Sequence, residues 1–149
     1  MEVMEKAKNT FISSMFWSER IGYSAGLATL EKMGKVHAQE HMMLAGSLVK
    51  YVWASAAEEA GLEIEITGLD PLATFAFKDD PNLAMITTFT QEMLKRGYLA
   101  AGQFYPSVRH RAFDTERFEK EVHEVFSDIA SGKAVLEGPP SIPGFRRLA

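Results

Sequence analysis

The segment from Thr10 to Met33, TFISSMFWSERIGYSAGLATLEKM, restricts the fold more than any other part of the chain. Its first half is a polar and aromatic stretch, and its second half is a helical pattern rich in glycine, alanine and serine. Small side chains keep a helix thin, so that other backbones can approach it closely. We therefore expect a helix that other parts of a protein cover on more than one side.

The two ends of this helix carry recognisable signals. Ser18 has a side-chain oxygen that suits the N-cap position, and Glu19 places a negative charge in the first turn, where the helix dipole favours it. Gly34 is expected to end the helix, because glycine readily adopts the left-handed conformation found just after a helix. Residues 1–33 are therefore predicted to form an arm and a connecting helix.

A second helix is predicted over residues 35–60, with Gly61 as its stop. Apolar side chains recur in it at helical spacing. They predict its buried face, which consists of Val36, Leu44, Leu48, Tyr51 and Val52.

Two strands are predicted next. Apolar and polar residues alternate over residues 62–67, which indicates a half-buried strand. Residues 72–78 form the second strand, with Phe75 and Phe77 on one face. The residues between them, 68–71, are typical of a turn. Because so short a connection joins neighbouring strands, we expect an antiparallel pair.

A third helix is predicted to start at Asp80, with this aspartate as N-cap and Pro81 at the first helical position. Gly97 ends it. Its core stripe is expected to consist of Ile86, Phe89, Met93 and Leu94. Residues 98–100 are short and apolar and predict a third strand, and a further short strand is expected around Phe104.

The last helix is expected to be capped by Asp114 and stopped by Gly132. Its core stripe recurs at helical spacing and consists of Phe118, Val122, Val125, Phe126 and Ile129. Residues 133–149 contain three prolines and two glycines, so this tail should lie extended over a surface and form no regular element.

The order of these elements predicts an α+β fold. We expect a small, mostly antiparallel sheet of three or four strands, packed with helices on one side and preceded by a long N-terminal helix. Residues 34–149, which include the tail, would form this C-terminal small domain.

Composition excludes several classes of function. The net charge of the 149-residue chain is -4, and no basic stripe is available to neutralise phosphates, so neither nucleic acid nor a membrane surface is expected as a partner. The absence of cysteine excludes disulfides, thiolate metal sites and cysteine nucleophiles. The N-terminus lacks the pattern of a signal peptide, and no uncharged apolar run could span a bilayer, so a cytoplasmic location is expected.

Several short motifs gain meaning from their order along the chain. After the Thr10 to Met33 segment come Gly61-Leu62 before a strand, Gln91-Glu92-Met93-Leu94 in a helix, Arg96-Gly97 after it, and Ser107 and His110 before the last helix. In this order and spacing they resemble the C-terminal part of class-III aminotransferases that depend on pyridoxal phosphate. Glutamate-1-semialdehyde aminomutase and related transaminases belong to this family.

The resemblance implies the C-terminal domain of a fold-type-I enzyme, whose reaction is the transfer or internal shift of an amino group on pyridoxal phosphate. It also implies that the large domain, with the lysine that binds this cofactor, lies upstream of Met1. We therefore expect no catalytic residue in this chain, no cofactor bound to the chain alone and no activity without the large domain.

The cofactor-binding positions that the resemblance implies are Ser14 and Met15. In the family, a threonine of this loop reaches the cofactor phosphate of the neighbouring subunit, and the matching position here is Met15. A thioether cannot donate a hydrogen bond to phosphate. Ser14 offers a hydroxyl that could take over this contact.

Two local patterns suggest other chemistry. His37, Glu40 and His41 match the H-x-x-E-H signature of a zinc hydrolase, in which Glu116 or Glu119 could supply a third ligand. We expect no metal there, because the family resemblance accounts for this helix without one. Ser107, His110 and Asp114 could form a serine-histidine-aspartate relay on paper. They lie very close in sequence, however, and no nucleophile elbow accompanies them.

A last alternative is a binding or oligomerisation module that derives from the same domain and acts without a catalytic partner. In either case the segment from residue 10 to residue 33 should self-associate. Five large apolar residues lie within seven positions of its loop: Phe11, Ile12, Met15, Phe16 and Trp17. Apolar patches of this size rarely stay exposed to water. We expect a two-fold dimer.

Overall fold

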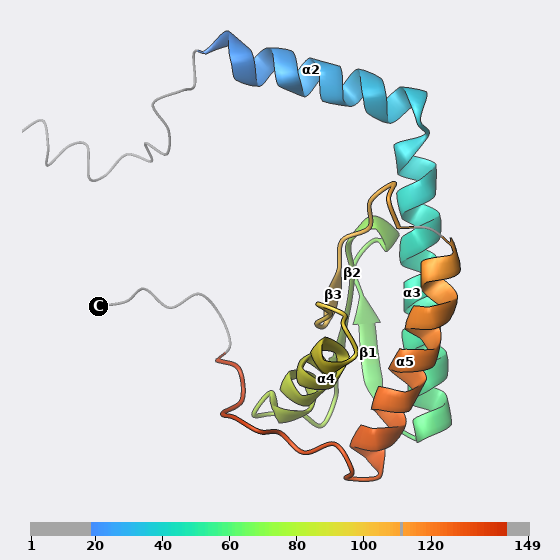
Figure 1. Ribbon diagram of the computed structural model, residues 1–149, viewed down its shortest axis with the longest axis vertical. Coiled ribbons are helices and arrows are strands. Elements are labelled where there is room, and N and C mark those ends of the chain that lie inside the picture. Colours follow the sequence, from blue (N-terminus) through green and yellow to red (C-terminus); the bar gives the residue numbers. More distant parts are fainter. Residues whose placement is uncertain (1–18, 111, 143–149) are drawn as a thin grey trace, which may run out of the picture. The chain divides into compact units, whose positions relative to one another are not determined.

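The computed structural model describes residues 19–110 and 112–142 and, in the last helix, side chains from Glu116 onward. The chain divides into two units, Met1–His37 and Ala38–Ala149. Figure 1 shows the helix described for the first unit, together with the strands and helices described for the second.

Helix α2, Arg20–Lys35, is the helix predicted from the small-residue segment. Its expected stop at Gly34 is wrong, because this glycine lies within the helix. The left-handed residue is His37, with φ of 50°. Histidine is among the residues that tolerate this conformation best. Ser18, the predicted cap, lies outside the described residues, and Glu19 takes the N-cap position with extended backbone angles.

Helix α3, Ala38–Ala60, buries a different face from the one predicted. Of the expected stripe only Val52 is buried, while Leu44 and Tyr51 are 61% and 66% exposed. The buried stripe consists of Val49, Val52, Trp53, Ala56 and Ala57. Its small alanines leave room for the aromatic side chains of the sheet.

The 3-10 helix η1, Asp70–Leu72, packs directly on the backbone of α3. A β-carbon placed on Gly46 would lie 1.7 Å from the carbonyl oxygen of Asp70. Only glycine permits this approach. The Lys50 ammonium fixes the same contact, because it donates to the Gly68 carbonyl at 2.7 Å and to the Asp70 carboxylate at 2.9 Å.

The sheet has the order β1-β2-β3, with β1 at Ile64–Thr67, β2 at Ala73–Phe77 and β3 at Gln103–Phe104. Both neighbouring pairs are antiparallel, which confirms the predicted hairpin. The strand expected over residues 98–100 is wrong, whereas the short strand around Phe104 is present. The pairing of β3 with β2 begins at Gln103. Next to it, the Gly102 carbonyl accepts a hydrogen bond from the Phe75 amide of β2 at 2.9 Å.

One face of the sheet forms the core with the three helices of this unit. The ring of Phe75 lies 4.7 Å from that of Trp53, 5.2 Å from that of Phe89 and 5.8 Å from that of Phe126. These partners belong to α3, α4 and α5 respectively. The other face carries Glu65, Thr67, Thr74, Ala76 and Gln103. The predicted α+β fold, with helices on one side of a small antiparallel sheet, is therefore confirmed.

Helix α4, Ala84–Lys95, begins later than predicted. Neither Asp80 nor Pro81 occupies its predicted position, because a turn precedes the helix and Leu83, with φ of 55°, is the N-cap. Asp80 still supplies the capping chemistry: its two carboxylate oxygens accept from the amides of Met85 and Ile86, each at 2.9 Å. An acidic group at this end also suits the helix dipole.

The core of α4 follows the predicted stripe only in part. Phe89 and Met93 are fully buried, whereas Leu94 is 58% exposed. Helix α5, Ala112–Ala130, buries Val122, Val125 and Phe126 as predicted and stops before Gly132, which has φ of 73°. Asp114, the predicted cap, lies within this helix.

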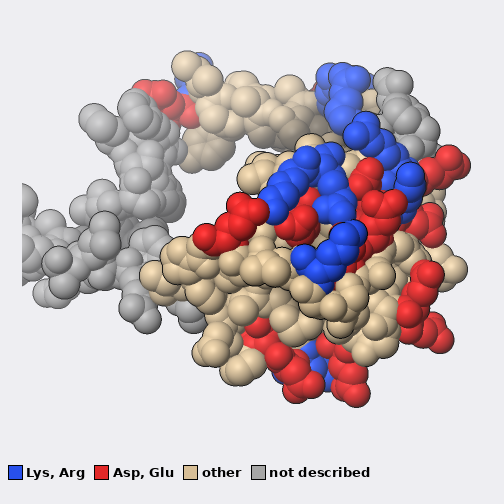
Figure 2. All heavy atoms as spheres, turned by 60° about the horizontal axis from the view of Figure 1, so that its bottom comes forward, with Lys and Arg blue, Asp and Glu red and all other residues tan. Residues whose placement is uncertain are grey.

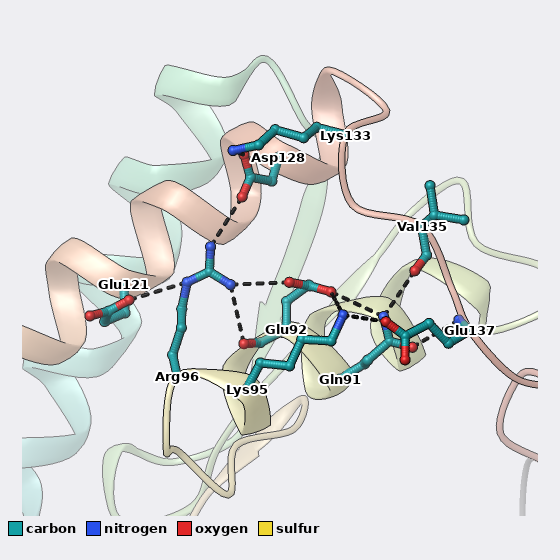
Figure 3. Close-up of polar contacts among 9 residues, drawn as sticks. All are labelled: Gln91, Glu92, Lys95, Arg96, Glu121, Asp128, Lys133, Val135 and Glu137. Atoms are coloured by element: carbon teal, nitrogen blue, oxygen red, sulfur yellow. Dashed lines mark hydrogen bonds and ion pairs between the residues drawn. The ribbon is translucent and has the colours of Figure 1, made fainter.

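The tail carries no helix or strand in its described part, residues 133–142. It crosses the outer side of α4, where one glutamine holds its backbone (Figure 3). The Gln91 amide group donates to the Val135 carbonyl and accepts from the Glu137 amide, both at 2.9 Å. Further along, the Ser141 amide donates to the Thr87 hydroxyl at 2.9 Å.

Among the helices that the structure describes, none combines the length and the apolar character that crossing a membrane requires.

We predict that Phe126→Ala lowers the free energy of unfolding by about 3–5 kcal/mol, because the fully buried ring contacts Phe75, Phe77 and Phe89. Denaturant unfolding measures this loss. Leu99→Ala is the matched control, because Leu99 is 93% exposed, and its midpoint should stay close to that of the wild type. Equal stability of the two variants would contradict this account of the core.

Candidate functional site

The two cofactor-binding positions that the sequence suggested, Ser14 and Met15, lie outside the described residues. Their contact with a cofactor phosphate therefore stays a prediction.

The zinc-hydrolase pattern does not assemble as its chemistry requires. Helix α3 begins at Ala38, so His37 precedes it in a left-handed turn and does not share a helical face with His41. The His41 Nε2–H donates to the carbonyl oxygen of His110 at 2.8 Å. Among the side chains that the structure describes, no three histidine, aspartate or glutamate residues are grouped so that they could bind one metal ion. Glu116 and Glu119, the suggested third ligands, therefore belong to no such group.

Ser107 and His110 do come together, but as a turn. The Ser107 amide donates to His110 Nδ1 at 2.9 Å, and the Ser107 hydroxyl lies 3.3 Å from the same nitrogen. The hydroxyl also accepts from the Arg109 amide at 3.2 Å. Because a backbone N–H already occupies Nδ1, this nitrogen is poorly placed to act as a base. The Asp114 side chain, the third member of the suggested relay, is outside the described part.

His110, which is hydrogen-bonded to His41 and Ser107, lines a cavity of about 450 Å³. This cavity lies between α3, the segment from Gly97 to Tyr105, and α5. Its lining is largely aromatic and apolar, and it includes Trp53, Tyr98, Phe104, Tyr105, His110 and Phe118. Several of these residues were predicted to lie in strands or in the core, and no pattern in the sequence indicated a cavity.

Contacts between rings fix the walls of this cavity. The rings of Tyr98 and Phe118 lie 5.7 Å apart, edge to face, and those of Phe104 and His110 lie 5.1 Å apart. The Arg117 guanidinium lies over the Tyr98 ring, 5.7 Å from its centre, and forms a cation–π contact with it. The walls are thus held in place without a ligand.

A second hollow, of about 460 Å³, lies over the open face of the sheet. Its polar lining includes Glu65, Gln103 and the hydroxyls of Thr67 and Thr74, which lie 2.6 Å apart. Among the residues that the structure describes, no lysine lines either hollow. Because pyridoxal phosphate is held covalently by a lysine in an enclosed site, the described residues do not fit this cofactor by themselves.

A group of three hydrogen-bonded side chains links α3 to α5, and no pattern in the sequence indicated it. The Ser55 hydroxyl lies 3.1 Å from His123 Nε2, and His123 Nδ1 lies 2.5 Å from the Glu59 carboxylate. The order of atoms matches a serine-histidine-acid relay. However, Ser55 lies inside helix α3 and lines neither of the two hollows described above. We interpret this group as a tie between the two helices.

The largest charged cluster centres on Arg96 and is shown in Figure 3. Its guanidinium pairs with the carboxylates of Glu92 and Glu121 at 3.2 Å and of Asp128 at 3.1 Å. Lys95 pairs with Glu92 at 2.7 Å and with Glu137 of the tail at 2.6 Å. This cluster joins α4, α5 and the tail and borders neither hollow, so its role is structural.

The charges of this cluster shift the pKa of two of its members. The hydrogen bond from Lys95 holds the pKa of Glu92 below its usual value, with help from Gln91 and Arg96 and against the effect of burial. The hydrogen bonds to Glu137 and then to Glu92 raise the pKa of Lys95. On the face drawn in Figure 2, basic side chains gather in the upper part with acidic ones beside them.

Comparison with known proteins shows the fold. No family model matches the chain, and no curated protein is significantly similar to it. A solved structure, described as the pyridoxal phosphate internal aldimine form of the FumI protein of Sphingopyxis sp. MTA144, matches with a TM-score of 0.73 and 20% sequence identity. The match covers 91% of this chain and 33% of that one, so the chain spans about a third of the length of this structural relative.

We predict that Glu92→Gln lowers the free energy of unfolding at neutral pH by about 1–2 kcal/mol, because the substitution removes a carboxylate that Lys95 and Arg96 share. A carboxyl group whose pKa is lowered by folding stabilises the protein above its unfolded pKa and loses this effect as the pH falls. The free energy of unfolding of the wild type should therefore decrease as the pH falls below about 4.3, and that of the variant should decrease less.

Urea unfolding at a series of pH values from 7 to 3 measures both effects. Glu65→Gln is the control, because Glu65 is exposed and lies outside the charged cluster. An identical loss of stability with falling pH in the wild type and in Glu92→Gln would disprove the assignment.

Proposed function

We propose that this chain supplies the small domain of a pyridoxal phosphate-dependent enzyme that transfers or internally shifts an amino group, as class-III aminotransferases and glutamate-1-semialdehyde aminomutase do. The observation that carries the proposal is the fold likeness to a protein whose structure contains this cofactor. The order of motifs from Thr10 to the last helix supports the same family.

In this proposal, the chain covers and orients a cofactor that another domain binds covalently. The described residues do not fit the cofactor by themselves, so we assign its lysine to a large domain outside this sequence. The hydroxyl of Ser14, next to Met15, is the group of this chain that we propose for the cofactor phosphate.

We predict that the purified chain, incubated with pyridoxal phosphate, retains no cofactor after dialysis and shows no transaminase activity. The reason is that its described lysines are exposed or ion-paired, as in the pair between Lys50 and Asp70 at 2.9 Å. Reduction with borohydride followed by mass spectrometry measures covalent attachment. A stoichiometric pyridoxyl group on one lysine, abolished by changing that lysine to arginine, would overturn the prediction.

The nucleotide sequence upstream of the Met1 codon tests the proposal itself. A large domain of fold type I with its lysine, encoded there or by a neighbouring gene, would support an enzyme. Absence of any such domain in the genome would disprove it and leave the binding or oligomerisation module as the function. Co-purification of this chain with the large domain would then measure whether the two associate.

The self-association that we propose depends on α2. None of its residues is buried, and its large apolar side chains are 64–76% exposed at Ile21, Tyr23, Leu27 and Leu30. A helix of this length is barely stable in water without a partner. At about 25 cal/mol per Å², covering several hundred Å² contributes several kcal/mol, which is enough to favour a two-fold dimer.

We predict that the wild-type chain is a dimer at micromolar concentration in light scattering and that a Leu27→Glu, Leu30→Glu variant is a monomer. Leu99→Glu is the control, because this leucine is even more exposed and lies outside α2, and this variant should stay dimeric. A monomeric wild type would refute the dimer and would favour the alternative in which residues 1–18 cover the helix.

A further inference from the structure

The cavity bordered by α3, residues 97–105 and α5 has the properties of a site for a small ligand. We infer that it binds a small uncharged aromatic compound that carries a carbonyl or hydroxyl oxygen. Its volume of about 450 Å³ falls within the range of ligand pockets in proteins. This inference is independent of the proposed enzyme function, because it concerns only residues of the chain itself.

Aromatic rings make up most of the wall and hold one another in place. Tyr98 packs edge to face on Phe118, and Phe104 packs in the same way on His110, with ring centres 5.7 and 5.1 Å apart. Trp53, on α3, closes the opposite side and is 1% exposed. An aromatic ligand gains offset or edge-to-face contacts from such walls, in addition to burying its own apolar surface.

His110 supplies a hydrogen-bond donor at this cavity. Because the Ser107 amide donates to Nδ1 at 2.9 Å, the neutral imidazole carries its proton on Nε2. Within the described part of the chain no acceptor is bonded to this Nε2–H, although the ring borders the cavity. The Nε2–H of His41 holds the backbone of the same residue through its carbonyl at 2.8 Å. A ligand oxygen matches the Nε2–H donor of His110 and the indole N–H of Trp53, which is unpaired among the described residues, in the same lining.

The charge of the lining decides between classes of ligand. Its described polar members are Gln103, His110, the hydroxyls of Tyr98 and Tyr105 and the buried indole N–H of Trp53, which has no hydrogen-bond partner in the described part of the chain, and no lysine, arginine, aspartate or glutamate is among them. The nearby cation, Arg117, already lies over the Tyr98 ring. A carboxylate or an ammonium group would lose its hydration here without gaining an ionic partner. The lining therefore favours an uncharged ligand.

Four probes of similar shape test this inference on the 149-residue chain: acetophenone, ethylbenzene, benzoate and benzylamine. Amide and indole resonances of the lining residues, followed by NMR titration, report binding. We expect saturable shifts with acetophenone and about 3- to 10-fold weaker binding of ethylbenzene, which lacks the acceptor. The two charged probes should bind more weakly than acetophenone. Tightest binding of benzylamine, or of benzoate, would overturn the ligand class.

Three variants test the location of the site. Ala45→Phe places a ring into the cavity and should abolish the shifts, whereas Ala54→Phe, on the exposed side of α3, should leave them unchanged. His110→Phe keeps a ring but removes the donor, and should reduce acetophenone binding to the level of ethylbenzene. If Ala45→Phe fails to fold, His110→Phe carries the test. Failure of acetophenone to bind the wild type, or unchanged binding in His110→Phe, would overturn the inference.

Discussion

The structure of the unit Ala38–Ala149 depends on the aromatic ring of Phe75, where the sheet meets its three α-helices. Trp53, Phe89 and Phe126 reach this ring from three different helices. A sheet of three short strands has little surface of its own, so these contacts between rings supply much of its attachment to the helices. The positions of α3, α4 and α5, and therefore the cavity that two of them border, follow from this single cluster.

Sequence patterns predicted the fold class, the hairpin and the core of the last helix, because each depends on a local periodicity. They failed on α3, which has two apolar stripes. Leu44 and Tyr51 lie on the exposed stripe, whereas Trp53 and the small side chains around Ala56 face the sheet. The choice depends on where Phe75 needs space, which is a contact between distant segments. Asp80 illustrates a different limit, since an aspartate can cap a helix that begins four residues later.

The candidate site could be predicted even less well. The sequence drew attention to His41, Ser107 and His110, but for metal or nucleophilic chemistry, and the structure joins them through hydrogen bonds to the backbone. The spacing of residues along the chain carries no information about which ring nitrogen a backbone amide will occupy. The cavity beside His110 depends on Tyr98 and Phe118, which a periodicity argument assigns to a strand and to a core helix.

The way in which Gln91 holds the tail has a consequence for how this protein can vary. Its side-chain amide pairs with one carbonyl and one amide of the tail backbone, which every residue except proline possesses in the same form. The anchor therefore recognises the path of the tail and not the side chains at Val135 or Glu137. Substitutions in the tail leave this backbone anchor intact, although one at Glu137 would remove the ion pair with Lys95, whereas the glutamine on α4 cannot be exchanged for a residue with only one kind of hydrogen-bonding group.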